Sequence, residues 1–302
     1  MHSPSILVLA AGLGSRYGGI KQMDPVGPHG EFVLDYSVFD AWRAGFRKAV
    51  LVIREELEEP LREHFAGKMD GKMQVDYVCQ RLDDLPAPFV CPSSRQKPWG
   101  TGHAIWSARH ALKGRFAVIN ADDFYGAQSY QILSKFLSSS DCEQDTYAMV
   151  AYRLANTLSE HGAVSRGICR VDEQGFLQDV VERTSIEPTE RGARYKDESG
   201  NWQPLTGEEP ASLNLWGFAD GLFAQMELLF KQFLKNHGQE EKSEFFIPSV
   251  VDSLIKAGQC RTKVLNTPEH WFGMTHASDR EIVVERIAKL TAEGVYPQRL
   301  WS

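Results

Sequence analysis

A glycine-rich turn with two basic residues stands near the start of the chain. Residues 7–22 read LVLAAGLGSRYGGIKQ, so an apolar run leads straight into glycines and then to Arg16 and Lys21. Small residues let backbone N–H groups approach an anion, and two cations five residues apart add charge for a polyphosphate. The GxGxxxG spacing fits neither the dinucleotide-binding GxGxxG nor the P-loop, whose lysine follows a glycine. The turn predicts a triphosphate site; the alternative is an ordinary turn with solvated cations.

Two carboxylates follow another apolar run. Residues 116–126 read FAVINADDFYG, which places Asp122 and Asp123 at the carboxyl end of a predicted strand. Ligands bind at that edge of open α/β sheets, and Mg²⁺ needs only one or two carboxylates when substrate phosphates supply other oxygens. Adjacent strand residues face opposite sides, so Asp123 is either a further ligand or a cap for the turn 124–126.

These segments require a scaffold of alternating strands and helices. Apolar runs predict buried strands, and helical spacing predicts two helices between them, each ending near a glycine that can cap it. The predicted strands are 6–11, 49–53, 74–78, 116–119 and 147–152, and the helices are 35–44 and 103–112. Such alternation favours a mostly parallel sheet with flanking helices.

The pattern of the sequence changes from Gly162 onward. Short strands and turn signals predict a β-rich insertion over the sheet, and helical periodicity returns later. The predicted strands are 168–171, 176–182, 194–196, 212–218 and 261–265, and the helices are 222–236, 248–257 and 280–293.

Composition excludes several classes of protein. With 302 residues and 42% hydrophobic positions, the chain can bury one large core or two closely packed lobes. The five cysteines are scattered without a CxxC pair, which predicts a reducing, cytoplasmic location. No apolar run approaches the roughly 20 residues that span a bilayer, so no membrane partner is expected. A net charge of −7 disfavours nucleic acid as a partner.

The motifs together resemble the nucleotide-sugar pyrophosphorylase, or NTP transferase, superfamily of sugar-1-phosphate nucleotidyltransferases. The resemblance includes a less-characterised bacterial branch with LAAGxGSRYGGxKQ, NADDFYG and EFFIP blocks, the last at residues 244–248. It implies a Rossmann-like, three-layer α/β/α (GT-A-like) fold with a mostly parallel central sheet and a β-rich sugar-binding insertion. The chain is then a single domain, with a nucleotide-binding half, 1–153, and a sugar-binding half with C-terminal helices, 154–302.

The same resemblance assigns roles to individual residues. Arg16 and Lys21 contact the reacting phosphates, and Asp122 holds Mg²⁺ as the third catalytic residue. The residues expected to contact the nucleotide are Ala10, Ala11, Gly12 and Gly14 at the phosphates, and Gln80, Gly100 and Thr101 at the base. The plainer alternative for residues 100–102 is a turn that caps the following helix.

The acceptor side is assigned in the same way. Glu182 is expected to contact sugar hydroxyls and Arg183 the sugar phosphate, while Asn214 and Trp216 supply a hydrogen bond and an apolar wall; a buried Asn and a core Trp are the alternatives. Gly273 stands where many relatives carry the aspartate that is the other magnesium ligand. Asp123 or Asp279 then takes that place, or Asp122 holds the metal with phosphates and water alone.

The implied activity is Mg²⁺-dependent transfer of a nucleoside monophosphate from an NTP, with UTP or dTTP favoured, to a sugar 1-phosphate, releasing pyrophosphate. One alternative is cytidylyl transfer to an amino-alcohol phosphate such as phosphocholine. Another, of a different class, is a non-catalytic nucleotide sensor, suggested by Gly273. The helix predicted at 280–293 packs internally or against another subunit of a homo-oligomer.

Overall fold

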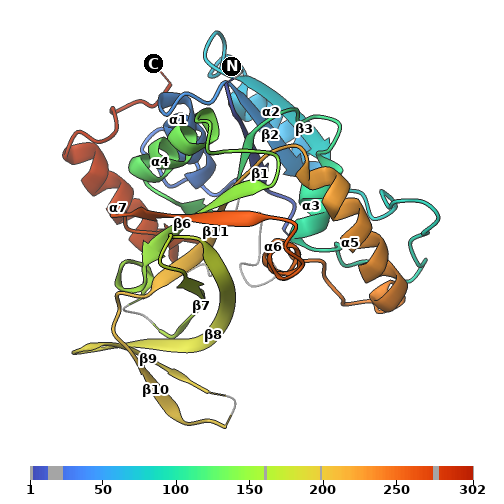
Figure 1. Ribbon diagram of the computed structural model, residues 1–302. Coiled ribbons are helices and arrows are strands. Elements are labelled where there is room, and N and C mark those ends of the chain that lie inside the picture. Colours follow the sequence, from blue (N-terminus) through green and yellow to red (C-terminus); the bar gives the residue numbers. More distant parts are fainter. Residues whose placement is uncertain (1–2, 13–22, 160–161, 198, 275–278, 302) are drawn as a thin grey trace.

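The computed structural model places a twisted sheet between two layers of helices (Figure 1). The structure describes residues 3–12, 23–159, 162–197, 199–274 and 279–301. Among these residues, no helix is long and apolar enough to cross a membrane.

The central part of the sheet is mostly parallel, as the sequence predicts. Its strands are, in spatial order, β3 (Gln74–Cys79), β2 (Lys48–Ile53), β1 (Ser5–Leu9), β4 (Phe116–Asn120), β11 (Pro210–Phe218), β6 (Thr146–Arg153) and β12 (Arg261–Thr267). Neighbours pair in parallel except at β11, which is antiparallel to both β4 and β6. Strands from both predicted halves of the chain therefore complete one sheet.

An antiparallel extension leaves the sheet at β11 and projects away from the helices (Figure 1). Its strands are β7 (Val164–Val171), β8 (Leu177–Thr189), β9 (Gly192–Lys196) and β10 (Trp202–Leu205). This is the predicted β-rich insertion. However, the predicted strand 212–218 is part of β11 and belongs to the central sheet, and β10 was not predicted.

The helices divide between the two faces of the sheet. One face is covered by α1 (Val33–Arg43), α2 (Glu58–Phe65) and α4 (Ala127–Ser138), and the other by α3 (Thr101–Ser107), α5 (Leu222–His237) and α6 (Ile247–Lys256). Strand periodicity produces this division: Ile6 and Val8 of β1 join the first core, and Leu7 joins the other. The result is the expected three-layer α/β/α architecture.

Two short helical turns, two two-residue strands and a further helix complete the described elements. They are η2 (Glu55–Leu57), β5 (Asp123–Phe124), η3 (Leu154–Thr157), β13 (Phe272–Gly273) and α7 (Asp279–Ala292). The helices α2 and α4 were not predicted from the sequence. Another difference concerns α3, which ends at Ser107, because the following residues form hydrogen-bonded turns instead of a continued helix.

Candidate active site

The carboxyl ends of β1, β3 and β4 lie along one edge of the sheet because these strands are parallel. At the end of β1, Ala10 donates a backbone hydrogen bond to Val52 on β2 (2.8 Å). Ala10 and Ala11 are buried, whereas Gly12 is exposed. The chain therefore emerges from the core at the residues expected to hold the nucleotide. Gly14, Arg16 and Lys21 lie outside the described residues, so their roles stay predictions.

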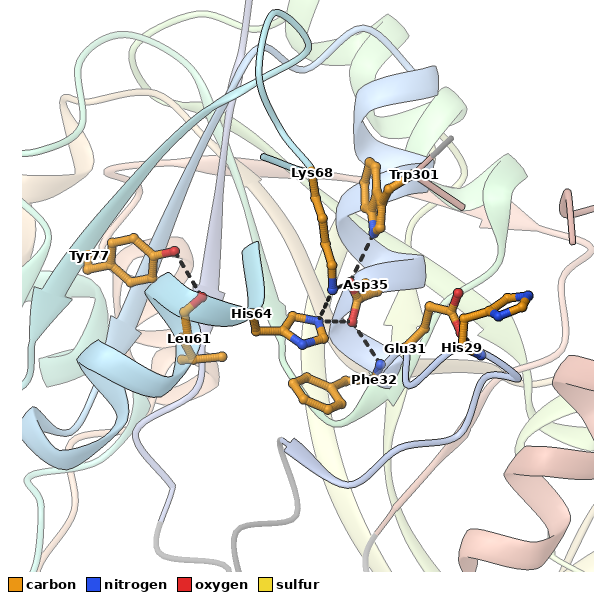
Figure 2. A network of polar contacts seen from close by, with 9 residues as sticks. All are labelled: His29, Glu31, Phe32, Asp35, Leu61, His64, Lys68, Tyr77 and Trp301. Atoms are coloured by element: carbon orange, nitrogen blue, oxygen red, sulfur yellow. Dashed lines mark hydrogen bonds and ion pairs between the residues drawn. The ribbon is translucent and has the colours of Figure 1, made fainter. Parts of the chain in front are cut away.

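A buried carboxylate fixes the helix that follows the glycine-rich turn. Asp35, in the first turn of α1, is fully buried and accepts the backbone N–H of Phe32 (2.7 Å) and the indole N–H of Trp301 (3.0 Å). It also contacts His64 Nε2 (2.7 Å) from α2 (Figure 2). Lys68 Nζ lies 3.0 Å from the same histidine nitrogen. Lys68 Nζ also lies 3.9 Å from Asp35 Oδ1, so two basic side chains stand beside the buried carboxylate.

The amide of Gln80 is oriented at the end of β3. Its Nε2 donates to the carbonyl of Gly100 (3.2 Å) and to Nδ1 of His103 (3.0 Å), while His103 Nε2 donates to the carbonyl of Asp84 (3.0 Å). Burial lowers the pKa of His103 to about 4, so the ring is neutral and this single tautomer satisfies both contacts. With its nitrogen held, Gln80 presents its carbonyl oxygen as the group that can accept from a ligand.

The loop before α3 packs tightly against the segment before α6. Gly100 has φ of +97°, and a Cβ on it would lie 2.8 Å from the backbone oxygen of Phe245. Gly102 donates to that same oxygen (2.8 Å), and Thr101 Oγ1 accepts from the backbone of Ile247 (3.1 Å). Gly100 is also the N-cap of α3. The capping role considered for this triplet is therefore present, and it holds the loop beside Gln80.

The two adjacent aspartates face different surroundings. Asp122 is partly exposed after β4, and its backbone carbonyl accepts from Met274 (3.0 Å). Asp123 is 9% exposed, and its Oδ2 accepts from Asn120 Nδ2 (2.9 Å) and lies 3.2 Å from the hydroxyl of Tyr125. Asp122 is thus the more accessible carboxylate, and Asp123 is held by neighbouring polar groups.

Gly273 leaves the space that the Asp123 carboxylate occupies. The two residues are direct partners in the β5–β13 ribbon. A Cβ on Gly273 would lie 2.5 Å from Asp123 Oδ1 and 2.9 Å from the ring of Trp271. A side chain at 273 and this placement of Asp123 therefore exclude one another.

The donor set suits a magnesium ion that shares its ligands with a substrate. Asp122 and Asp123 offer hard oxygens, whereas the described residues contain no group of three or more acidic, histidine or cysteine side chains able to hold a metal alone. Mg²⁺ commonly takes its remaining ligands from phosphates and water. Asp279 is the first residue of α7, and its role as a metal ligand stays a prediction.

The proposed acceptor residues lie on β8. Glu182 pairs with Gly167 of β7, and desolvation raises its pKa while the nearby Arg166 lowers it. The guanidinium of Arg183 lies over the ring of Tyr195 on β9, 4.6 Å from the centroid. Both side chains therefore come from the base of the antiparallel extension.

Asn214 and Trp216 mark an irregularity in β11. The register shifts between Ser212 and Trp216, and Asn214 has φ of +61°, a conformation that asparagine tolerates better than most residues. The Trp216 indole donates to Asn214 Oδ1 (3.4 Å). Because Trp216 is completely buried beside Phe218, it contacts the core in place of the pocket wall suggested by the sequence.

The sequence reasoning did not single out His103, Trp271 or Arg166. His103 stands inside the KPWGTGHA segment, so its spacing from Gln80 was visible, but their contact was not. Trp271 stands two residues before Gly273, in the segment compared with the relatives' metal aspartate, whereas Arg166 carries no motif; the two meet because β7 and the segment before β13 lie together.

The fold is a three-layer α/β/α architecture, and comparison with protein families identifies the class of protein. Residues 6–272 match the model of the nucleotidyl transferase family, and the chain belongs to that family. Comparison with curated protein sequences gives no match.

Solved structures of similar fold cover nearly the whole chain, each at a TM-score of 0.61. A UDP-glucose pyrophosphorylase complexed with UDP-glucose is 17% identical and covers 95% of this chain and 99% of its own. A putative glucose-1-phosphate thymidylyltransferase from Bacillus anthracis is 11% identical, with 93% and 94% coverage. The inositol-1-phosphate CTP transferase from T. maritima is 13% identical, with 96% and 97% coverage. At these identities the similarity establishes the shared fold.

Proposed function

We propose that this nucleotidyltransferase transfers a nucleoside monophosphate from an NTP to a sugar 1-phosphate and releases pyrophosphate. The observation that carries the proposal is the placement of Asp122 at the same sheet edge where β1 leads into the glycine-rich turn. A UDP-glucose pyrophosphorylase and a putative glucose-1-phosphate thymidylyltransferase share the fold, which favours a sugar phosphate as the acceptor. UTP or dTTP is the favoured donor, and the amide of Gln80, oriented by its contacts with Gly100 and His103, is proposed to contact the base.

In this reaction, an oxygen of the acceptor phosphate attacks the α-phosphorus of the NTP. The new P–O bond forms as the bond to the departing pyrophosphate breaks, and an anionic phosphate needs no general base. Mg²⁺, held by Asp122 and assisted by Asp123, would supply positive charge at the phosphates. Arg16 and Lys21 are proposed to offset the negative charge of the pyrophosphate, Glu182 to accept from acceptor hydroxyls, and Arg183 to bind its phosphate. Catalysis then depends on positioning and charge neutralisation.

A second candidate is cytidylyl transfer to a phosphorylated alcohol that is not a sugar. The inositol-1-phosphate CTP transferase matches the fold as well as the sugar-phosphate relatives do. Phosphocholine and inositol 1-phosphate are the acceptors that separate this candidate from the first.

Pyrophosphate release from four NTPs, crossed with sugar 1-phosphates, inositol 1-phosphate and phosphocholine, tests both candidates. We expect Mg²⁺-dependent turnover with one pair, and a loss of about 10²–10³-fold in Asp122→Ala, similar to the loss of a group that stabilises transition-state charge. Asp252→Ala is the matched control, because Asp252 forms a surface ion pair with Lys256 on α6 (2.7 Å). NTP binding without pyrophosphate release from any pair would instead favour the sensor.

A further inference from the structure

Arg166 is a buried cation near the start of β7. Its side chain is 8% exposed, and the guanidinium donates to the backbone carbonyls of Ser165 (2.7 Å) and Thr157. The guanidinium also lies over the ring of Trp271, 4.5 Å from the centroid. These contacts fix Arg166 between η3, β7 and the segment that leads into β13.

Arg166 forms no direct ion pair with a carboxylate of the residues that the structure describes. Its hydrogen bonds to described residues go to backbone carbonyls, and its Nε is buried without a partner among them. Burial lowers its pKa to about 10, and the negative charges of Asp123 and Glu182 oppose that shift. The side chain therefore stays charged at neutral pH, although burial of a charge is costly.

Arg166 is also the direct cross-strand partner of Arg183. Directly opposed residues on antiparallel strands project from the same face, and like charges in such a pair destabilise the sheet. Two opposed arginines, one of them desolvated, place two positive charges on this face of the sheet, and the nearby carboxylates of Asp123 and Glu182 offset part of that charge. That arrangement is favourable when an anion occupies the same face.

We propose that Arg166 is a positioning residue for the anionic acceptor: its buried guanidinium provides fixed positive charge beside Arg183 and holds β7 against Trp271. This inference rests on the proposed function, because it assumes that the acceptor phosphate binds at Arg183. Arg166 itself is not expected to touch the acceptor. It acts by fixing β7 and by adding positive charge near Arg183.

The test compares Arg166→Gln with Arg166→Lys, using the NTP and acceptor that turn over fastest in the wild-type protein. We expect the glutamine variant to raise the KM for the acceptor about tenfold or more, as for residues that orient ligand-binding groups. The KM for the NTP should change less than twofold. The lysine variant retains the charge, so it should recover most of the acceptor affinity. Arg170→Gln is the matched control: Arg170 lies on the same strand but is exposed and paired with Asp179 (2.6 Å).

Melting temperatures identify any variant that fails to fold. If Arg166→Gln does not fold, the KM values of Arg166→Lys for the acceptor and for the NTP test the inference in its place. An unchanged acceptor KM in Arg166→Gln would overturn the inference. An equal rise in both KM values without recovery by lysine would do the same, because it indicates a structural role. If the wild-type protein uses no phosphorylated acceptor, the proposed function and this inference both fail; turnover with equal acceptor KM in the Arg166 and Arg170 variants rejects the inference alone.

Discussion

The contact between Gly273 and Asp123 shows how one missing side chain changes a site. Substitution Gly273→Ala places a Cβ 2.5 Å from Asp123 Oδ1, so the carboxylate has to move. We expect a loss of about 1–3 kcal/mol in the free energy of unfolding, typical of overpacking, together with weaker Mn²⁺ binding in the presence of NTP. Chemical denaturation and calorimetric titration with Mn²⁺ measure the two effects.

A double-mutant cycle separates this collision from a general effect on the β5–β13 ribbon. In Asp123→Ala the colliding oxygen is absent, so adding Gly273→Ala should cost clearly less than it does in the wild-type protein. Equal costs in both backgrounds would show that the other close neighbours of the new Cβ, the Trp271 ring and the Asp122 carbonyl, resist the substitution.

At the scale of elements, the Asp35 network joins the start of α1 to α2 and to the end of the chain (Figure 2). Asp35→Ala removes a buried acceptor and leaves its donors without a partner. We expect a loss of about 3 kcal/mol in the free energy of unfolding, measured by denaturation. Because α1 follows the glycine-rich turn, the KM for the NTP should also rise.

The exposed pair Glu58–Arg62 on α2 provides the control for that experiment. Arg62 Nη2 lies 2.8 Å from Glu58 Oε1, but both side chains are substantially exposed. Glu58→Ala should therefore lower the free energy of unfolding clearly less than Asp35→Ala does. Comparable losses in the two variants would mean that Asp35 contributes no more than a surface charge.

The elements also show how far the sequence alone could lead. Strands such as β1 and β4 are continuous apolar runs, and the helices α5 and α7 are periodic, so both kinds of element were predictable. Leu61 and Phe65 of α2 lie at helical spacing with Leu57, which directly precedes the helix, but Pro60 and the many charges of α2 masked the pattern.

The candidate site was predictable only where a motif marked it. Asp122 and Gln80 stand at strand ends that the sequence predicted. The pairing of Asp123 with Gly273 depends on two-residue strands about 150 positions apart, which have no periodicity to detect. The buried position of Arg166 likewise depends on Trp271, which lies more than 100 residues later in the chain, so no local sequence pattern indicates it.

At the scale of the whole molecule, the C-terminal segment packs on α1 around a buried acid. Asp40 is 1% exposed; its Oδ2 accepts from the hydroxyl of Tyr296 (2.6 Å), and its Oδ1 has no hydrogen-bond partner among the described residues. Burial raises the pKa of Asp40 to about 7, although the Tyr296 hydrogen bond opposes the shift. Docking of the C-terminal segment is therefore coupled to protonation of one side chain.

The sign of this coupling gives a pH dependence. Because the folded protein binds the Asp40 proton more tightly than the unfolded chain, the contribution to stability is complete below the unfolded pKa of 3.8 and is lost as pH rises through about 7. The loss is at most about 4 kcal/mol, from about three pKa units at 1.36 kcal/mol each.

Asp40→Asn cannot titrate, so its melting temperature relative to the wild-type protein should rise between pH 5 and pH 8. Asp252→Asn, at a partly exposed aspartate of α6 that pairs with Lys256, is the matched control. Parallel profiles for Asp40→Asn and the wild-type protein would show that the buried acid does not control the docking of the C-terminal segment.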